Sequence, residues 1–183
     1  MPNWCSNTLV LKHEDPTMIK RAEDSFAEGR FFEEFVPNPA GEWDYNWSVA
    51  NWGTKWDVGH SDGINDVKSN EIVLYFDSAW SPPIAAYDTM LELGFEIEAH
   101  YFEGGMMFAG VYDNGSDALY ELNNMSADEV RKELPPELDE MFGISEQIYE
   151  YELEDQDDVT AWYKEGVVDT GLTPHSKKDN DYE

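Results

Sequence analysis

The segment EIVLYFDSAWSPPIAAYDTMLELGFEIEAHYF, residues 71–102, decides the fold because it holds two strand patterns with a helix pattern between them. Its first seven residues are mostly aliphatic, β-branched and aromatic, which is typical of a strand. Ser81 and Pro82 are a favourable helix start, and Gly94 is a suitable helix end. The final FEIEAHYF alternates apolar with polar residues and therefore predicts a half-exposed strand.

The residues before this segment predict the first half of the same unit. Residues 7–13 read as a mostly apolar strand, and Asp15 and Pro16 are the cap and first residue expected of a helix. Residues 55–58 predict a short strand that pairs with residues 71–77 across a polar loop. The order strand, helix, strand, strand, helix, strand is that of a ferredoxin-like α+β sandwich, with an antiparallel sheet and two helices on one face.

Two turn signals predict that the sheet continues. The dipeptides Gly-Gly at 104–105 and Asn-Gly at 114–115 are typical of hairpins. The strands beside these turns should therefore extend the antiparallel sheet as a β meander. Residues 1–122 are expected to form one ferredoxin-like domain with these extra hairpin strands.

The remaining residues predict an acidic appendage. Residues 123–170 are expected to form an acidic C-terminal extension that packs on the domain, with a capping box at Ser126 opening its first helix. Residues 149–154 alternate Tyr or Leu with Glu, which predicts a strand. Residues 171–183 are polar and are expected to form a flexible tail.

Composition points to a basic partner. Asp and Glu number 40 against 11 Lys and Arg, so the formal net charge is -29. Direct binding to nucleic acid or to a membrane would work against long-range repulsion. With one cysteine, Cys5, and scattered histidines, we expect no disulfide, no metal site and no cofactor. The chain shows no targeting segment or long apolar run, which predicts a cytoplasmic protein.

The acidity is densest in residues 133–163, which contain no Lys or Arg. If the alternating glutamates of residues 149–154 share a strand face, their carboxylates recur at about 6.7 Å, close to two phosphate steps of about 3.4 Å along a DNA strand. This spacing is compatible with a DNA mimic, and equally with acidity that serves solubility alone. The predicted partner-binding face consists of Glu137, Asp139, Glu140, Glu150, Glu152, Glu154, Asp155, Asp157 and Asp158.

The stretch NWGTKWDVG places one of the few lysines, Lys55, between Trp52 and Trp56. In a structural interpretation the tryptophans anchor the core, and Lys55 neutralises local carboxylates at a tryptophan-built corner. In a functional interpretation Lys55 and Asp57 share a strand face near Trp80 and form a small polar pocket for a ligand. The sequence leaves both interpretations open.

Three motifs in the first hundred residues, PNWCSN, WGTKWD and FDSAWSPP, resemble those of the YubB-like family of uncharacterised phage and plasmid proteins. The resemblance implies a ferredoxin-like domain and a mobile-element setting, and it brings no established activity. By analogy, we expect a phage- or plasmid-encoded acidic protein that acts in the host cytoplasm. It would bind and inhibit or redirect a basic host protein, such as a nucleic-acid-binding enzyme or a defence complex. The alternative is a small-molecule-binding protein or enzyme with a pocket near Lys55, Asp57 and Trp80, although no catalytic motif is evident.

Overall fold

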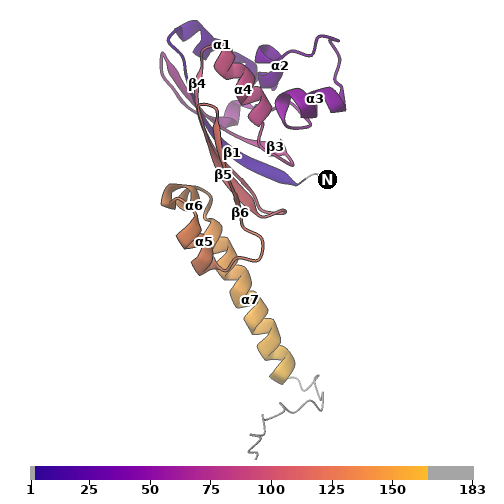
Figure 1. Ribbon diagram of the computed structural model, residues 1–183, viewed down its shortest axis with the longest axis vertical. Coiled ribbons are helices and arrows are strands. Elements are labelled where there is room, and N and C mark those ends of the chain that lie inside the picture. The colour runs from indigo at the N-terminus through magenta and orange to yellow at the C-terminus, as the bar shows by residue number, and fades with distance from the viewer. Residues whose placement is uncertain (1–2, 165–183) are drawn as a thin grey trace, which may run out of the picture.

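A computed structural model describes residues 3–164, and its centre is a six-stranded antiparallel sheet in the order β2-β3-β1-β4-β5-β6 (Figure 1). The strands are β1 (Trp4–Lys12), β2 (Ile64–Val67), β3 (Glu71–Ala79), β4 (Glu96–Glu103), β5 (Phe108–Asp113) and β6 (Ser116–Glu121). The helices are α1 (Pro16–Ala27), α2 (Phe31–Phe35), α3 (Tyr45–Trp52), α4 (Ile84–Glu92), α5 (Ala127–Glu133), α6 (Pro136–Phe142) and α7 (Ile144–Lys164), with a 3₁₀ turn, η1 (Ser61–Gly63).

Strands β2, β3, β1 and β4 have the ferredoxin-like order. The connection that contains α1 joins β1 to β2, and the connection that contains α4 joins β3 to β4; in each case one antiparallel strand lies between the two that are joined. Figure 1 shows α1 to α4 gathered on one side of the sheet, with α5 to α7 at the opposite end of the molecule. Strands β5 and β6 extend the sheet beyond β4 as the predicted meander. The prediction of a ferredoxin-like α+β fold is therefore confirmed.

The alternation of the central strand β1 explains which face the first four helices cover. Leu9 and Leu11 are fully buried, whereas Thr8 points to the opposite face and is partly exposed. Leu9 pairs with Leu74 of β3 and Ala99 of β4, so three strands contribute to one apolar surface. Helices α1, α2 and α4 bury this surface in the larger hydrophobic core.

Helix α1 begins as the sequence predicts. The Asp15 carboxylate accepts a hydrogen bond from Thr17 N at 2.9 Å, and Pro16 occupies the first turn. Gly29 follows the helix with φ of +72°, a conformation that glycine adopts without steric cost.

A second buried cluster joins α5, α6 and α7 to the other face of β4 and β5. The predicted capping box is present, because the Ser126 side chain accepts from Glu129 N while the Glu129 carboxylate accepts from Ser126 N. The cluster thereby fastens the C-terminal helices to the sheet through apolar contacts. Its buried members are Phe102, Ala109, Leu122, Val130, Leu134, Leu138 and Ile144.

Two local predictions are wrong. Residues 149–154 belong to helix α7, not to a strand, because Ile144 and Ile148 pack at helical spacing in the second cluster and the helix continues through these residues. Residues 55–58 form no strand either, and β3 pairs instead with β2, which lies within the predicted polar loop. The predicted tail, residues 171–183, lies outside the described residues.

The helices of residues 3–164 include none that is long and apolar enough to cross a membrane.

Candidate functional site

The ammonium group of Lys55 lies against aromatic rings at a corner of the molecule. Its Nζ atom is 4.3 Å from the ring centroid of Trp56, 5.1 Å from that of Trp80 and 5.9 Å from that of Tyr45. Among the described residues, no carboxylate forms an ion pair with Lys55, so the expectation that it neutralises local carboxylates gains no support from the ion pairs of residues 3–164. Each such cation–π contact at an exposed site contributes about 0.5–1 kcal/mol.

The corner is held in place by hydrogen bonds between the end of α3 and the end of β3. Thr54 Oγ1 donates to Ala79 O and accepts from Ala79 N, both at 3.0 Å. Ser81 Oγ donates to Gly53 O at 2.5 Å. Gly53 has φ of +84°, and a Cβ atom there would come within 3.2 Å of backbone atoms in the Pro82 to Ile84 turn. The Gly-Thr and Ala-Trp-Ser motifs thus join two chain segments that lie far apart in the sequence.

Trp80 has a strained backbone. Its φ is +69°, a region in which a large side chain is uncommon and which costs about 1–3 kcal/mol. The Trp80 N–H donates to Asn3 O at 2.9 Å, which helps to hold this conformation. The indole is 40% exposed, so the strain directs a large aromatic ring toward solvent. Strain of this kind is a feature of binding sites, and it draws attention to the surface around Trp80.

The other two residues of the predicted pocket point elsewhere. Trp52 is 5% exposed and its indole N–H donates to Val36 O at 2.9 Å, so it is a core residue. The carboxylate of Asp57 accepts from Phe32 N, Glu33 N and Val58 N at 2.7–2.8 Å, and so caps α2 from a distance. Burial raises the pKa of Asp57, and the three N–H donors oppose that rise. Lys55, Asp57 and Trp80 therefore do not converge on one space.

Trp80 also lines a large groove between α4 and the β5–β6 hairpin. The groove has a volume of about 950 Å³, within the range of ligand sites. Gly110 of β5 leaves space for the Tyr101 ring that borders the groove, because a Cβ atom at position 110 would lie 2.2 Å from that ring. The apolar side chains that line the groove include Trp80, Pro82, Ile84, Met106, Phe108 and Leu119.

Carboxylates supply the charge of the groove. Tyr101 Oη donates to Asp117 Oδ1 and Tyr112 Oη donates to Asp88 Oδ1, both at 2.7 Å. Burial is the larger cause, and these hydrogen bonds the next, of a pKa above the ordinary value for both tyrosines, so both hydroxyls remain protonated donors at neutral pH. The described residues that line the groove include no Lys, Arg or His. An apolar surface with unneutralised carboxylates attracts a ligand that is both apolar and cationic.

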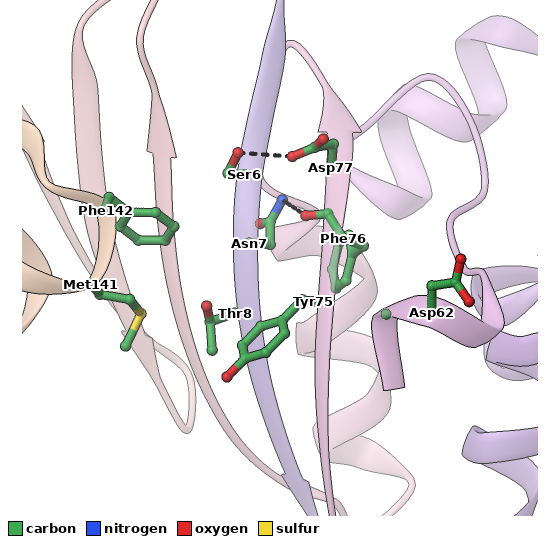
Figure 2. Close-up of a pocket in the computed structure, with 10 residues that line it drawn as sticks. Ser6, Asn7, Thr8, Asp62, Tyr75, Phe76, Asp77, Met141 and Phe142 are labelled. Carbon is green, nitrogen blue, oxygen red and sulfur yellow. Dashed lines mark hydrogen bonds between the residues drawn. The ribbon is translucent and has the colours of Figure 1, made fainter. Parts of the chain in front are cut away.

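A second hollow lies on the sheet face that α1 and α4 leave uncovered (Figure 2). It has a volume of about 570 Å³, with Thr8 and Asp77 on its floor and Met141 of α6 on one side. Ser6 Oγ donates to Asp77 Oδ1 at 2.8 Å. A neighbouring hollow of about 290 Å³ leads from Asp77 toward the rings of Trp4 and Trp56, and no Lys or Arg lines either hollow in the described part of the chain.

The predicted acidic face is divided between two helices. Glu137, Asp139 and Glu140 lie in α6, whereas Glu150, Glu152 and Glu154 lie in α7. Two of these residues have structural partners. Asp139 accepts from Ser145 N and Oγ at 2.7 Å, and Glu152 accepts from Ala127 N at 3.2 Å. The remaining three, Asp155, Asp157 and Asp158, fall within α7, and their side chains lie outside the described part of the structure.

Several residues of these surfaces were missed by sequence reasoning. Tyr45 reaches the Lys55 corner because Asp44 caps α3 and places Tyr45 in its first turn; the Asp44 carboxylate accepts from Trp47 N at 2.7 Å. The pattern Asp-Tyr-Asn-Trp was the signal that could have identified this cap. Nothing in the sequence indicated that Tyr101 and Asp117 form a pair, because that contact depends on strand register.

The fold and these surfaces define an acidic α+β protein with a ferredoxin-like sheet, whose hollows are lined by aromatic rings and carboxylates. Comparisons with known proteins find no protein family, curated protein or solved structure that matches the chain.

Proposed function

We propose that this chain is a phage or plasmid protein that binds a basic host protein through the outer surface of α7. The supporting observation is a ridge of three exposed glutamates, Glu146, Glu150 and Glu154, spaced by four residues. Four helical residues rise about 6 Å, so the three carboxylates line one side of the helix. Like charges at this spacing destabilise an isolated helix by about 0.2–0.5 kcal/mol per pair, and a basic partner relieves that repulsion.

The position of the ridge favours recognition over a structural role. Ile148 and Glu152 face the second cluster and α5, and at about 100° per residue the ridge falls on the far side of α7. Beside it, Tyr149 is 48% exposed and Leu153 is 43% exposed, one turn apart. Acidic and apolar side chains next to one another, with nothing covering them in residues 3–164, suit an interface with a basic and partly apolar surface.

In its sharper form the proposal is that the ridge occupies a nucleic-acid-binding groove. The strand spacing of about 6.7 Å does not apply to residues 149–154, because they form part of a helix. The helical repeat of about 6 Å is also near two phosphate steps of about 3.4 Å. In this form, DNA or RNA should compete with the protein for its partner. At an ordinary acidic interface, outside a nucleic-acid-binding groove, we expect no such competition.

The alternative of a ligand pocket or active site at Lys55, Asp57 and Trp80 receives no support from the geometry. Asp57 is turned toward α2, and the Lys55 ammonium is already in contact with three rings.

The test is a charge reversal with a matched control. The variant Glu146→Lys/Glu150→Lys/Glu154→Lys changes the ridge, and Glu14→Lys/Glu92→Lys/Glu96→Lys makes the same change in net charge at exposed glutamates that have no ion-pair partner in the described structure. Glu152 is left intact because it caps α5. The host protein retained by the wild type is identified by mass spectrometry and its affinity for each variant is measured by biolayer interferometry.

We expect the ridge variant to bind about tenfold or more weakly than the control, and wild-type affinity to fall as salt rises. Equal affinities for the two variants, or binding that persists unchanged to about 0.5 M salt, would falsify the proposal. Competition by duplex DNA then separates the mimic from an ordinary acidic interface.

A further inference from the structure

Strand β6 is a regular sheet edge whose outer side is open in the described structure. It is last in the strand order, six residues long and continuously paired with β5 on its inner side. Asn114 and Gly115 connect the two strands, both with positive φ, as a two-residue type I′ turn requires. The opposite edge, β2, is a poorer template because it has four residues and a register shift at Ile64/Asp66.

The register of the hairpin determines which backbone groups face outward. In a two-residue hairpin the residues beside the turn, Asp113 and Ser116, form a hydrogen-bonded pair, and such pairs alternate along the ladder. Asp117, Leu119 and Glu121 are therefore at the non-hydrogen-bonded positions, with their N–H and C=O groups directed to the free edge. Their side chains share the face that lines the groove beside Trp80.

The side chains of these three residues alternate in character. Asp117 and Glu121 are exposed acids, and Leu119 between them is 55% exposed. An incoming antiparallel strand places its own alternate side chains directly opposite these three, about 4.5–5.5 Å away. The matching pattern is basic, any residue, apolar, any residue, basic.

We infer that β6 and the adjoining groove bind an extended basic segment of a partner protein by strand addition. The segment's main chain pairs with Asp117, Leu119 and Glu121, its two basic side chains face the carboxylates, and its apolar side chain enters the groove against Leu119 and Phe108. The inference rests on the proposed function for the basic character of the partner. It adds a second contact surface, the β6 edge, which is separate from the α7 ridge.

Charge decides between this occupant and a second copy of the chain. Two β6 strands paired about a two-fold axis at Leu119 would set Asp117 of each copy against Glu121 of the other, and like charges directly opposite are destabilising. The same two acids attract a strand with lysine or arginine at those positions. The edge thus rejects its own copy and accepts a basic strand.

The probe is a synthetic peptide, acetyl-Thr-Lys-Thr-Ile-Thr-Lys-Thr-amide, titrated into the full chain by calorimetry and by amide NMR. Three controls accompany it: the same peptide with Glu for Lys, the same peptide with N-methyl groups on alternate amides, and the polyamine spermidine. The protein variant Asp117→Asn/Glu121→Gln removes both charges, while the amide oxygen introduced at position 117 can still accept from Tyr101 Oη.

The expected result is saturable binding of the lysine peptide, with slower hydrogen exchange at the amides of Asp117, Leu119 and Glu121. The double variant should bind it about fivefold more weakly, since each opposed charge pair stabilises a strand pairing modestly. The glutamate peptide and the N-methylated peptide in the blocking register should not bind.

Four outcomes overturn the inference: no peptide binding, equal affinity of the double variant, equal binding of spermidine without protection of the edge amides, and a dimer formed through β6 in the free protein. If the peptide does not bind but the partner binds the ridge variant more weakly than the control variant, the proposed function is still supported. If the peptide binds but the partner has equal affinity for the ridge variant and the control variant, the strand-addition site is supported and the proposed α7 interface is not.

Discussion

Truncation of the two tryptophans beside Lys55 should have unequal consequences for stability. Trp52 is 5% exposed and its indole N–H donates to Val36 O, whereas Trp56 is 37% exposed and its ring contacts Lys55 and Trp4. Burying a large aromatic side chain removes about 150–250 Å² from water, and truncation in a core costs about 3–5 kcal/mol. Trp52→Ala also leaves Val36 O without its donor, so we expect a loss of about 4–5 kcal/mol.

The loss for Trp56→Ala should be smaller. Its exposed fraction leaves less area to lose, and the cation–π contact adds about 0.5–1 kcal/mol, so we expect about 1–2 kcal/mol in total. For a domain of this length 1 kcal/mol shifts the melting temperature by about 2–4 °C. Trp52→Ala should therefore lower it by about 8–20 °C and Trp56→Ala by about 2–8 °C, measured by far-UV circular dichroism. Trp52→Phe is the control that retains most of the packing. Equal shifts for the two alanine variants would refute the assignment of one tryptophan to the core and the other to the surface.

Four further predictions concern three residues, Asp57, Gly110 and Cys5. Asp57→Ala should cost about 2–3 kcal/mol in urea unfolding because three N–H groups lose their acceptor, while Asp57→Asn, which keeps one acceptor oxygen, should cost less. Burial raises the pKa of Asp57 in the folded protein. At a pH just above the ordinary pKa of about 4, the folded protein therefore binds more protons than the unfolded chain, and the stability of the wild type relative to Asp57→Asn should fall as pH rises. A rise in this relative stability would contradict the burial argument. Gly110→Ala should lower the free energy of unfolding by about 1–3 kcal/mol because its Cβ atom meets the Tyr101 ring, and thermal melts in which it matched the wild type would show that the ring can move aside. Cys5 is fully buried and burial raises its pKa to about 12, so the folded protein should react with a thiol reagent only as fast as it unfolds, and rapid reaction at neutral pH would place the thiol at the surface.

Much of the fold could be predicted because its signals are local. The alternation in residues 95–102, the Asp15-Pro16 helix start and the Ser126 capping box each depend on neighbours within a few positions. The failure at residues 149–154 shows where local pattern is insufficient. Tyr and Glu at alternate positions fit a strand by period, but Glu also favours helices, and the packing of the partly buried Ile148 against the second cluster favours α7.

The candidate sites were less predictable because they depend on which distant segments meet. Lys55, Trp56 and Trp80 were named from the motifs that contain them, and the structure brings these three together. Asp57 was expected beside them, yet the open N-terminus of α2 offers three hydrogen bonds to its carboxylate. The groove beside Trp80 and the open edge of β6 had no sequence signal of their own.

By itself, the sequence determined the order of strands and helices in the ferredoxin-like core apart from the position of β2, the strong negative charge and the expectation of a basic partner, because composition and short-range periodicity carry that information. Only the tertiary structure decided which acids are exposed and which are caps: Glu150 lies on the open ridge of α7, whereas Glu152, two residues later, accepts a hydrogen bond from α5. The physical reason is that a carboxylate's role depends on the donors that packing brings within about 3 Å, and those donors come from segments that the local sequence does not specify.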